Sequence, residues 1–118
     1  MVYTLAFLTR PKPGITEDEF FVHYRDVHRP LAQKLPGLLA YRQTRIRKDG
    51  FRGADAGDYA AYSEYTFNSE QDAAVAWRSP EGIALDEDTG RFMDWPSVLT
   101  LPLTELGTFM SEHKETTE

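Results

Sequence analysis

The chain has 118 residues, enough for one domain with a core of its own. It contains no cysteine, which excludes disulfides, thiolate metal sites and cysteine nucleophiles. Nineteen acidic residues against thirteen basic ones give a net charge of −6, which argues against nucleic-acid binding. No apolar run approaches the length of a membrane span, and the N-terminus lacks the basic region of a signal peptide. We therefore expect a cytoplasmic protein.

The first half of the chain predicts a strand, a helix and a second strand. Residues 2–9 are apolar and β-prone on both faces, as in a strand that is covered on both sides. Thr16 followed by Glu19 forms a capping box, which predicts the start of a helix. One face of that helix is apolar with helical spacing, and its members are Phe20, Tyr24, Val27, Leu31 and Leu35. The helix is expected to end at Pro36-Gly37, and residues 38–46 predict the second strand.

Pro30 stands inside this helix, where a proline removes a backbone hydrogen bond and strains the chain. It also biases Arg29 away from helical angles, so we expect a kink or a break at residues 28–31. His28 comes just before the proline and points towards the apolar face or its margin, whereas His23 lies at the solvent boundary. The break is therefore expected to turn the His28 imidazole into the space between helix and sheet.

The second half predicts a loop, a strand, a helix, a second short helical piece and a last strand, over residues 48–58, 59–67, 69–78, 80–93 and 99–103. Ser69 is an N-cap signal, and Pro80 stands where prolines begin helices. Pro102 favours an edge position or a bulge for the last strand. The residues from Ser111 onwards are polar and acidic, and we expect them to fray.

The order of elements is βαββαβ, the split βαβ pattern of ferredoxin-like α+β domains. It predicts a four-stranded antiparallel sheet with the helices on one face, formed by residues 1–110, and a polar tail at 111–118. The uncovered face should carry Tyr41 or Tyr62, with polar residues mixed in, namely Gln43, Arg45 and Glu64. Such a face is seldom left in water, so we expect a symmetric homodimer whose two sheets enclose a barrel-like interior.

His28 is the strongest candidate for chemistry, because an imidazole titrates near neutrality and suits a general acid or base. The alternative is a core histidine whose hydrogen bonds are satisfied. An orienting partner would have to come from another element, since the neighbouring Arg25 and Asp26 point elsewhere. The phenol of Tyr41 is a candidate donor to a substrate oxygen, and the alternative is an aromatic side chain packed in the sheet. The further candidates for substrate contact are Tyr24, Tyr62 and Leu31.

No metal or other cofactor is predicted. The acidic run Asp86-Glu87-Asp88 with Gly90 lacks the glycine and glutamate positions of a calcium loop, and we interpret it as a solvated helix end. His23 and His28 are five positions apart, whereas a zinc-binding pair on a helix is four apart. The glycines do not lead from a strand into a helix as a dinucleotide-binding pattern requires.

Three segments carry a resemblance to a known family, and they are LTRPKPGITEDEF at 8–20, HYRDVHRPLA at 23–32, and residues 35–41, which begin Leu-Pro-Gly. Together they resemble the EthD family, and the resemblance extends more weakly to residues 77–80 and 86–94. It implies a ferredoxin-like fold that dimerises into an α+β barrel.

The resemblance also implies a class of function. The family is named for a protein required to degrade a fuel ether. Its wider relatives include a methylmuconolactone methylisomerase, aromatic polyketide cyclases and cofactor-free oxygenases, which act on oxygenated, largely apolar molecules without metal or flavin. His28 and Tyr41 match the family positions of an acid/base histidine and a substrate-contacting tyrosine. The methylisomerase has a further histidine after its second strand, and residues 48–58 contain no counterpart.

The leading hypothesis is a cofactor-independent enzyme that performs acid/base chemistry on an oxygenated, largely apolar substrate, aromatic or lactone-like, held in the barrel cavity. His28 would move a proton next to a carbonyl, and Tyr41 would hydrogen-bond the oxygen that gains negative charge. Isomerisation, cyclisation, dehydration and cofactor-free oxygenation share that first step. The alternatives are a non-catalytic binding or accessory protein for a hydrophobic metabolite, and a structural dimer with a filled interior.

Overall fold

The sheet has four antiparallel strands in the order β2-β3-β1-β4. The structure is a computed structural model that describes residues 2–53 and 57–112. The strands are β1 (Tyr3–Thr9), β2 (Ala40–Arg45), β3 (Ala61–Phe67) and β4 (Leu99–Leu103). The first and third strands in sequence are central, and β4, which contains Pro102, is an edge strand as predicted.

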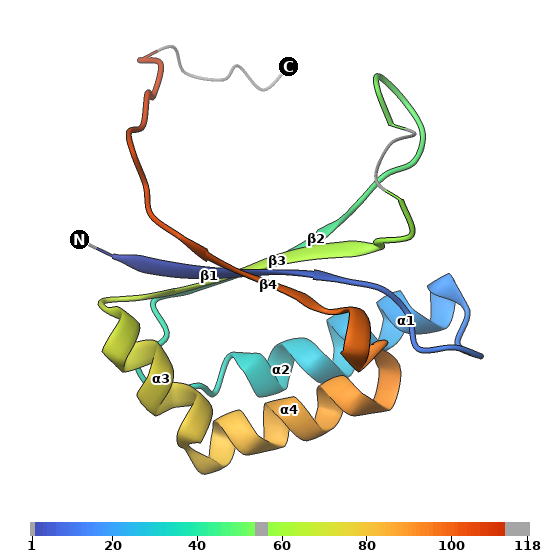
Figure 1. The fold of residues 1–118 in the computed structure, drawn as a ribbon, viewed down its shortest axis with the longest axis horizontal. Coiled ribbons are helices and arrows are strands. Elements are labelled where there is room, and N and C mark those ends of the chain that lie inside the picture. Colours follow the sequence, from blue (N-terminus) through green and yellow to red (C-terminus); the bar gives the residue numbers. More distant parts are fainter. Residues whose placement is uncertain (1, 54–56, 113–118) are drawn as a thin grey trace.

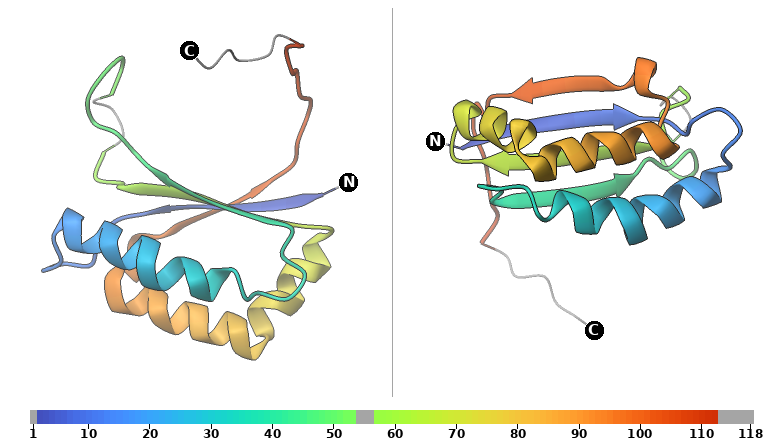
Figure 2. Two further views of the ribbon diagram at one scale, coloured as in Figure 1. Left: turned by 180° about the vertical axis from the view of Figure 1, so that it is seen from behind. Right: turned by 90° about the horizontal axis from the view of Figure 1, so that it is seen from below.

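The helices all cover one face of this sheet (Figures 1 and 2). In chain order they are α1 (Glu17–His23), η1 (Tyr24–His28), α2 (Arg29–Ala32), α3 (Glu70–Arg78), α4 (Pro80–Phe92) and the short η2 (Trp95–Ser97). The capping box at Thr16 begins α1, and the Ser69 and Ser79 side chains cap α3 and α4. The predicted ferredoxin-like α+β fold is therefore confirmed. None of the described helices is long and apolar enough to cross a membrane.

The helix that contains Pro30 runs on without the break that the sequence predicted. His28 and Arg29 have ordinary right-handed helical dihedral angles, and five residues from Tyr24 to His28 form a π-helical turn. In that turn the Arg29 N–H donates to the carbonyl of Tyr24, five positions back. The wider turn changes the backbone hydrogen-bond pattern at the position where Pro30 has no N–H to donate. Pro30 therefore stands in the first turn of α2 and does not end the helix. The helix then ends at Ala32, earlier than predicted.

The two faces of β2 are the reverse of the prediction. Tyr41 is paired with the buried Tyr65 and lies on the face that the helices cover. On the same face, Gln43 donates to the carbonyl of Tyr24 in η1, and Arg45 pairs with Glu17 in α1. Because these side chains are polar, the sequence predicted that they face solvent. Since β2 is an edge strand, its long polar side chains can lie on the inner face and still reach the helices at the margin of the core. Tyr62 and Glu64 do lie on the open face, as predicted, and the Tyr62 hydroxyl donates to Glu64 at 2.8 Å.

Two hydrophobic clusters pack between the helices and the sheet. One is built around Tyr65, Phe67 and Leu85, and the other around Phe20 and Phe92. Val27, which the periodicity placed on the apolar face of the first helix, is 43% exposed. It falls inside the π-helical turn, where a period of 3.6 no longer describes which residues point inward. The predicted polar tail lies beyond the described residues from position 113 onwards.

Candidate active site

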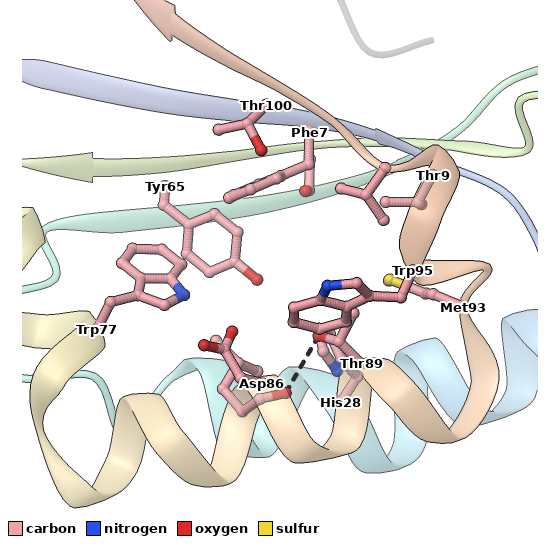
Figure 3. Close-up of a pocket in the computed structure, with 13 residues that line it drawn as sticks. Phe7, Thr9, His28, Tyr65, Trp77, Asp86, Thr89, Met93, Trp95 and Thr100 are labelled. Carbon is pink, nitrogen blue, oxygen red and sulfur yellow. Dashed lines mark hydrogen bonds between the residues drawn. The ribbon is translucent and has the colours of Figure 1, made fainter.

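A cavity of about 200 Å³ lies between the helices and the sheet (Figure 3). Its walls come from strands β1, β3 and β4, from η1, α3 and α4, and from the segment that follows α4. The polar side chains among its lining residues are Thr9, His28, Ser63, Asp86, Thr89 and Thr100, together with the phenol of Tyr65. The remaining walls are apolar or aromatic, including both tryptophans of the chain, Trp77 and Trp95. The cavity is thus an apolar chamber with a few polar groups directed into it.

His28, on η1, lines this cavity, and one of its ring nitrogens is hydrogen-bonded. Its side chain is only 3% exposed, and Nδ1 lies 2.8 Å from Oδ2 of Asp88 on α4. The Asp88 carboxylate is completely buried, and its other oxygen lies 2.8 Å from Nε2 of His23. Arg91, one turn along α4, donates to that same oxygen at 3.3 Å. Asp88 is therefore the orienting partner from another element that His28 requires.

The π-helical turn explains how two histidines five positions apart reach one carboxylate. In an α-helix that spacing places side chains on well-separated sides, which is why the sequence did not pair His23 with His28. A π-turn closes hydrogen bonds over five positions, so residues five apart come to lie over one another. Both imidazoles then face α4, where they also pack against Phe92, with ring centroids 4.4 and 5.0 Å away.

The electrostatics of Asp88 favour its ionised form. Burial alone would raise the pKa of Asp88, but the hydrogen bonds and charges of His28 and His23 together outweigh burial and hold that pKa below its usual range. A carboxylate only accepts hydrogen bonds, so a neutral His28 must carry its proton on Nδ1. Nε2 is then the basic nitrogen, and it makes no hydrogen bond within the described part of the chain. The His28–Asp88 pair has the orientation of a general base held by a carboxylate.

Tyr24, Tyr41 and Tyr65 lie close together between helices and sheet, and of these Tyr65 reaches the cavity. The hydroxyl of Tyr65 points from β3 into the cavity (Figure 3). The ring of Tyr41 packs against that of Tyr65 at a tilt of 36°, with the ring centroids 4.5 Å apart. The Tyr41 hydroxyl accepts a hydrogen bond from Gln43. Burial, and then the neighbouring phenols, raise the pKa of Tyr65 well above its ordinary value. Tyr65 therefore stays protonated, and its hydroxyl has a proton that it can donate.

Asp86 brings a second carboxyl group to the site. It projects from α4 into the cavity, between Trp77 and the Tyr65 hydroxyl (Figure 3). Burial raises the pKa of Asp86, and the Trp77 side chain and the charge of His28 act in the opposite direction.

The structure brings only part of the predicted site together. Of the residues predicted from the sequence, His28 lines the cavity, whereas Tyr24, Tyr41 and Leu31 do not. Tyr24 and Tyr41 line a shallower groove beside β2, and Leu31 packs against the aromatic core. Tyr62 lies on the opposite face of the sheet from the cavity.

Sequence reasoning missed Asp86 and Asp88, which it interpreted as a solvated helix end. It also missed Tyr65, whose position in the middle of a strand resembles that of any core aromatic. One signal was available for Asp88: on an α4 that begins at Pro80, it lies three positions after the apolar Leu85 and four before Phe92, on the same face.

Comparison with known families supports this description of the fold. The EthD domain model matches residues 12–96, which is most of the chain. The chain belongs to the EthD family. By sequence, no curated protein matches it significantly.

EthD-family and related structures share its architecture. An EthD family protein from Bacillus halodurans is 24% identical, with a TM-score of 0.74, and the match covers 90% of this chain and 100% of that one. SnoaB, a cofactor-independent oxygenase from Streptomyces nogalater, is 11% identical with a TM-score of 0.67, covering 93% and 98%. A hydroxynitrile lyase from Passiflora edulis is 16% identical with a TM-score of 0.67, covering 92% and 97%. Similar structures also include proteins described as dimeric.

Proposed function

We propose that this EthD-family protein is a cofactor-independent enzyme that moves a proton on an oxygenated, largely apolar small molecule held in the cavity. The observation that carries the proposal is the 2.8 Å contact between His28 Nδ1 and the buried carboxylate of Asp88, because it leaves Nε2 as the basic nitrogen of an imidazole that lines the cavity. A histidine that served only to fill the core would have no need of a cavity beside it.

The proposed first step takes a proton from a carbon next to a carbonyl. His28 Nε2 accepts that proton, and the Asp88 carboxylate stabilises the resulting imidazolium through Nδ1. The electron pair moves onto the carbonyl oxygen, where the Tyr65 hydroxyl donates a hydrogen bond to the growing charge. Tyr65 takes the role for which the sequence suggested Tyr41, and Tyr41 supports its ring from behind. Isomerisation, elimination, cyclisation and reaction of the enolate with oxygen all continue from this intermediate.

The test begins with the small molecules that the purified protein retains, identified by mass spectrometry. Conversion of that molecule is then measured with the wild type, His28→Gln and an exposed control, Glu87→Gln. We expect His28→Gln to lower kcat by about 10²–10⁴-fold and the control to leave it unchanged. Unchanged turnover in His28→Gln would refute the catalytic role. Tight binding without any conversion would instead favour the binding or accessory protein.

We further propose that two copies of the chain pair through the open face of the sheet. Leu99 and Leu103 on β4 are 45% and 36% exposed there, although both are large and apolar. Leu101 lies between them on the same face, paired with Ala6 of β1. A symmetric pair would cover this surface and produce the barrel that the family resemblance implies.

A further inference from the structure

We propose that the cavity selects uncharged ligands over their carboxylate analogues, and that Asp86 is the residue responsible. This inference rests on the cavity being the ligand site of the proposed function, and it names the chemical class of that ligand. The class is a neutral molecule of one or two rings with a carbonyl oxygen and a neighbouring hydroxyl or amide N–H.

The first support is the different environment of the two carboxyl groups on α4. Asp88 is matched by His28, His23 and Arg91, which contact its two oxygens at 2.8–3.3 Å. Asp86 lies two positions earlier and forms no ion pair with any Lys, Arg or His that the structure describes. The charge of Asp88 is thus balanced within its own cluster, whereas that of Asp86 is directed into the cavity (Figure 3).

The second support is the composition of the wall. None of the described residues that line the cavity is a lysine or an arginine, and the only cationic candidate, His28, is shared with Asp88. A ligand carboxylate would lose its hydration, meet no cation of its own and lie close to Asp86. Two like charges a few ångströms apart repel strongly where water is excluded.

The third support is the arrangement of donor and acceptor. The Tyr65 hydroxyl supplies a donor suited to a carbonyl oxygen, and Asp86 next to it supplies an acceptor suited to an O–H or N–H. A neutral amide or hydroxycarbonyl compound satisfies both groups at once. A carboxylate satisfies the donor only. A volume of about 200 Å³ restricts the rest of the ligand to a small ring system.

The experiment uses two probes of equal shape and different charge, cinnamamide and cinnamate, at pH 7.5. Binding is followed through the indole N–H signals of ¹⁵N-labelled protein, because Trp77 and Trp95 are the only tryptophans and both line the cavity. We expect cinnamamide to shift both signals with a Kd about tenfold or more below that of cinnamate. In Asp86→Asn the ratio should fall to about threefold or less because cinnamate binds more tightly.

Two controls make the result specific. Glu87→Gln removes a neighbouring exposed carboxylate and should leave the ratio unchanged. His28→Gln should retain the preference for cinnamamide even if it abolishes turnover, so failure of this inference is distinguishable from failure of the proposed catalysis. Equal affinities in the wild type, an unchanged ratio in Asp86→Asn, or no movement of either indole signal with either probe would overturn the inference.

Discussion

The buried position of Asp88 depends on the side chains that bind its carboxylate. In the sequence it is the last member of an acidic run, yet its side chain is completely buried beneath η1. A carboxylate cannot be buried in its ionised form unless its oxygens are hydrogen-bonded. His28, His23 and Arg91 provide those bonds, and the same bonds fix the orientation of His28. The residue is therefore central to the structure of the site and to the chemistry proposed for it.

Replacing Asp88 with asparagine should lower the free energy of unfolding by about 2–3 kcal/mol, because charge-assisted hydrogen bonds are lost in a buried place. Urea denaturation monitored by tryptophan fluorescence measures the effect. The exposed neighbour provides the control, since Glu87→Gln should change stability by less than about 0.5 kcal/mol. Equal stability of the two variants would show that the buried cluster contributes little.

Asp88 also predicts how stability depends on pH. Its pKa is lowered in the folded protein relative to the unfolded value of about 3.9, so the unfolded state binds the proton more readily. Its contribution is present above the unfolded pKa and is lost as the pH falls through the folded pKa. We expect the stability difference between wild type and Asp88→Asn to shrink as the pH is lowered from 6 towards 3. A difference that stays constant over that range would contradict the assigned ion pairs.

At the scale of elements, η1 shows what periodicity can and cannot predict. The capping box, the helix and the inward direction of His28 all follow from local sequence. The continuity of the helix through Pro30 does not, because a π-turn is a small local rearrangement with no fixed pattern of residues. That turn also exposes Val27 and pairs His23 with His28. A single change of helical period therefore accounts for the exposure of Val27 and for the shared contact of His23 and His28 with Asp88.

The contact between η1 and α4 depends on Phe92, whose ring packs against Phe20, Tyr24, His23 and His28. Phe92→Ala should lower the free energy of unfolding by about 3–5 kcal/mol, because it empties a buried aromatic position. The matched change on the exposed side of η1, Val27→Ala, should have an effect of less than about 1 kcal/mol. Thermal unfolding of both variants measures the contrast. Similar losses in the two would show that η1 is not anchored through Phe92.

At the scale of the whole molecule, the strand order was predictable, whereas of the site only the position of His28 was. The βαββαβ order restricts the sheet to very few topologies, so the ferredoxin-like fold follows from the elements alone. Which side chains of β2 face the helices could not be predicted without the register of β2 against β3, which pairs Tyr41 with Tyr65. The cavity takes its polar groups from segments as far apart as Thr9 and Thr100, so no local pattern contains it.

The proposed dimer makes a prediction at the same scale. Leu101→Asp places a charge between Leu99 and Leu103 on the open-face side of β4 and should convert the dimer to a monomer. Val75→Asp is the matched control, because Val75 is also exposed but lies on α3, on the other side of the molecule. Sedimentation velocity at micromolar concentration distinguishes the two species. A monomeric wild type, or a Leu101→Asp variant that is still a dimer, would refute the proposed interface.

The most direct test of the account is the protonation of the His28 imidazole, observed in long-range ¹H–¹⁵N spectra over a pH titration. The account predicts that neutral His28 carries its proton on Nδ1, towards Asp88, and that Nε2 resonates as an unprotonated nitrogen available to the cavity. Asp88→Asn should weaken this preference, because an amide side chain can accept from Nδ1–H or donate to an unprotonated Nδ1. A neutral His28 with its proton on Nε2 would contradict the assignment of His28 as the base.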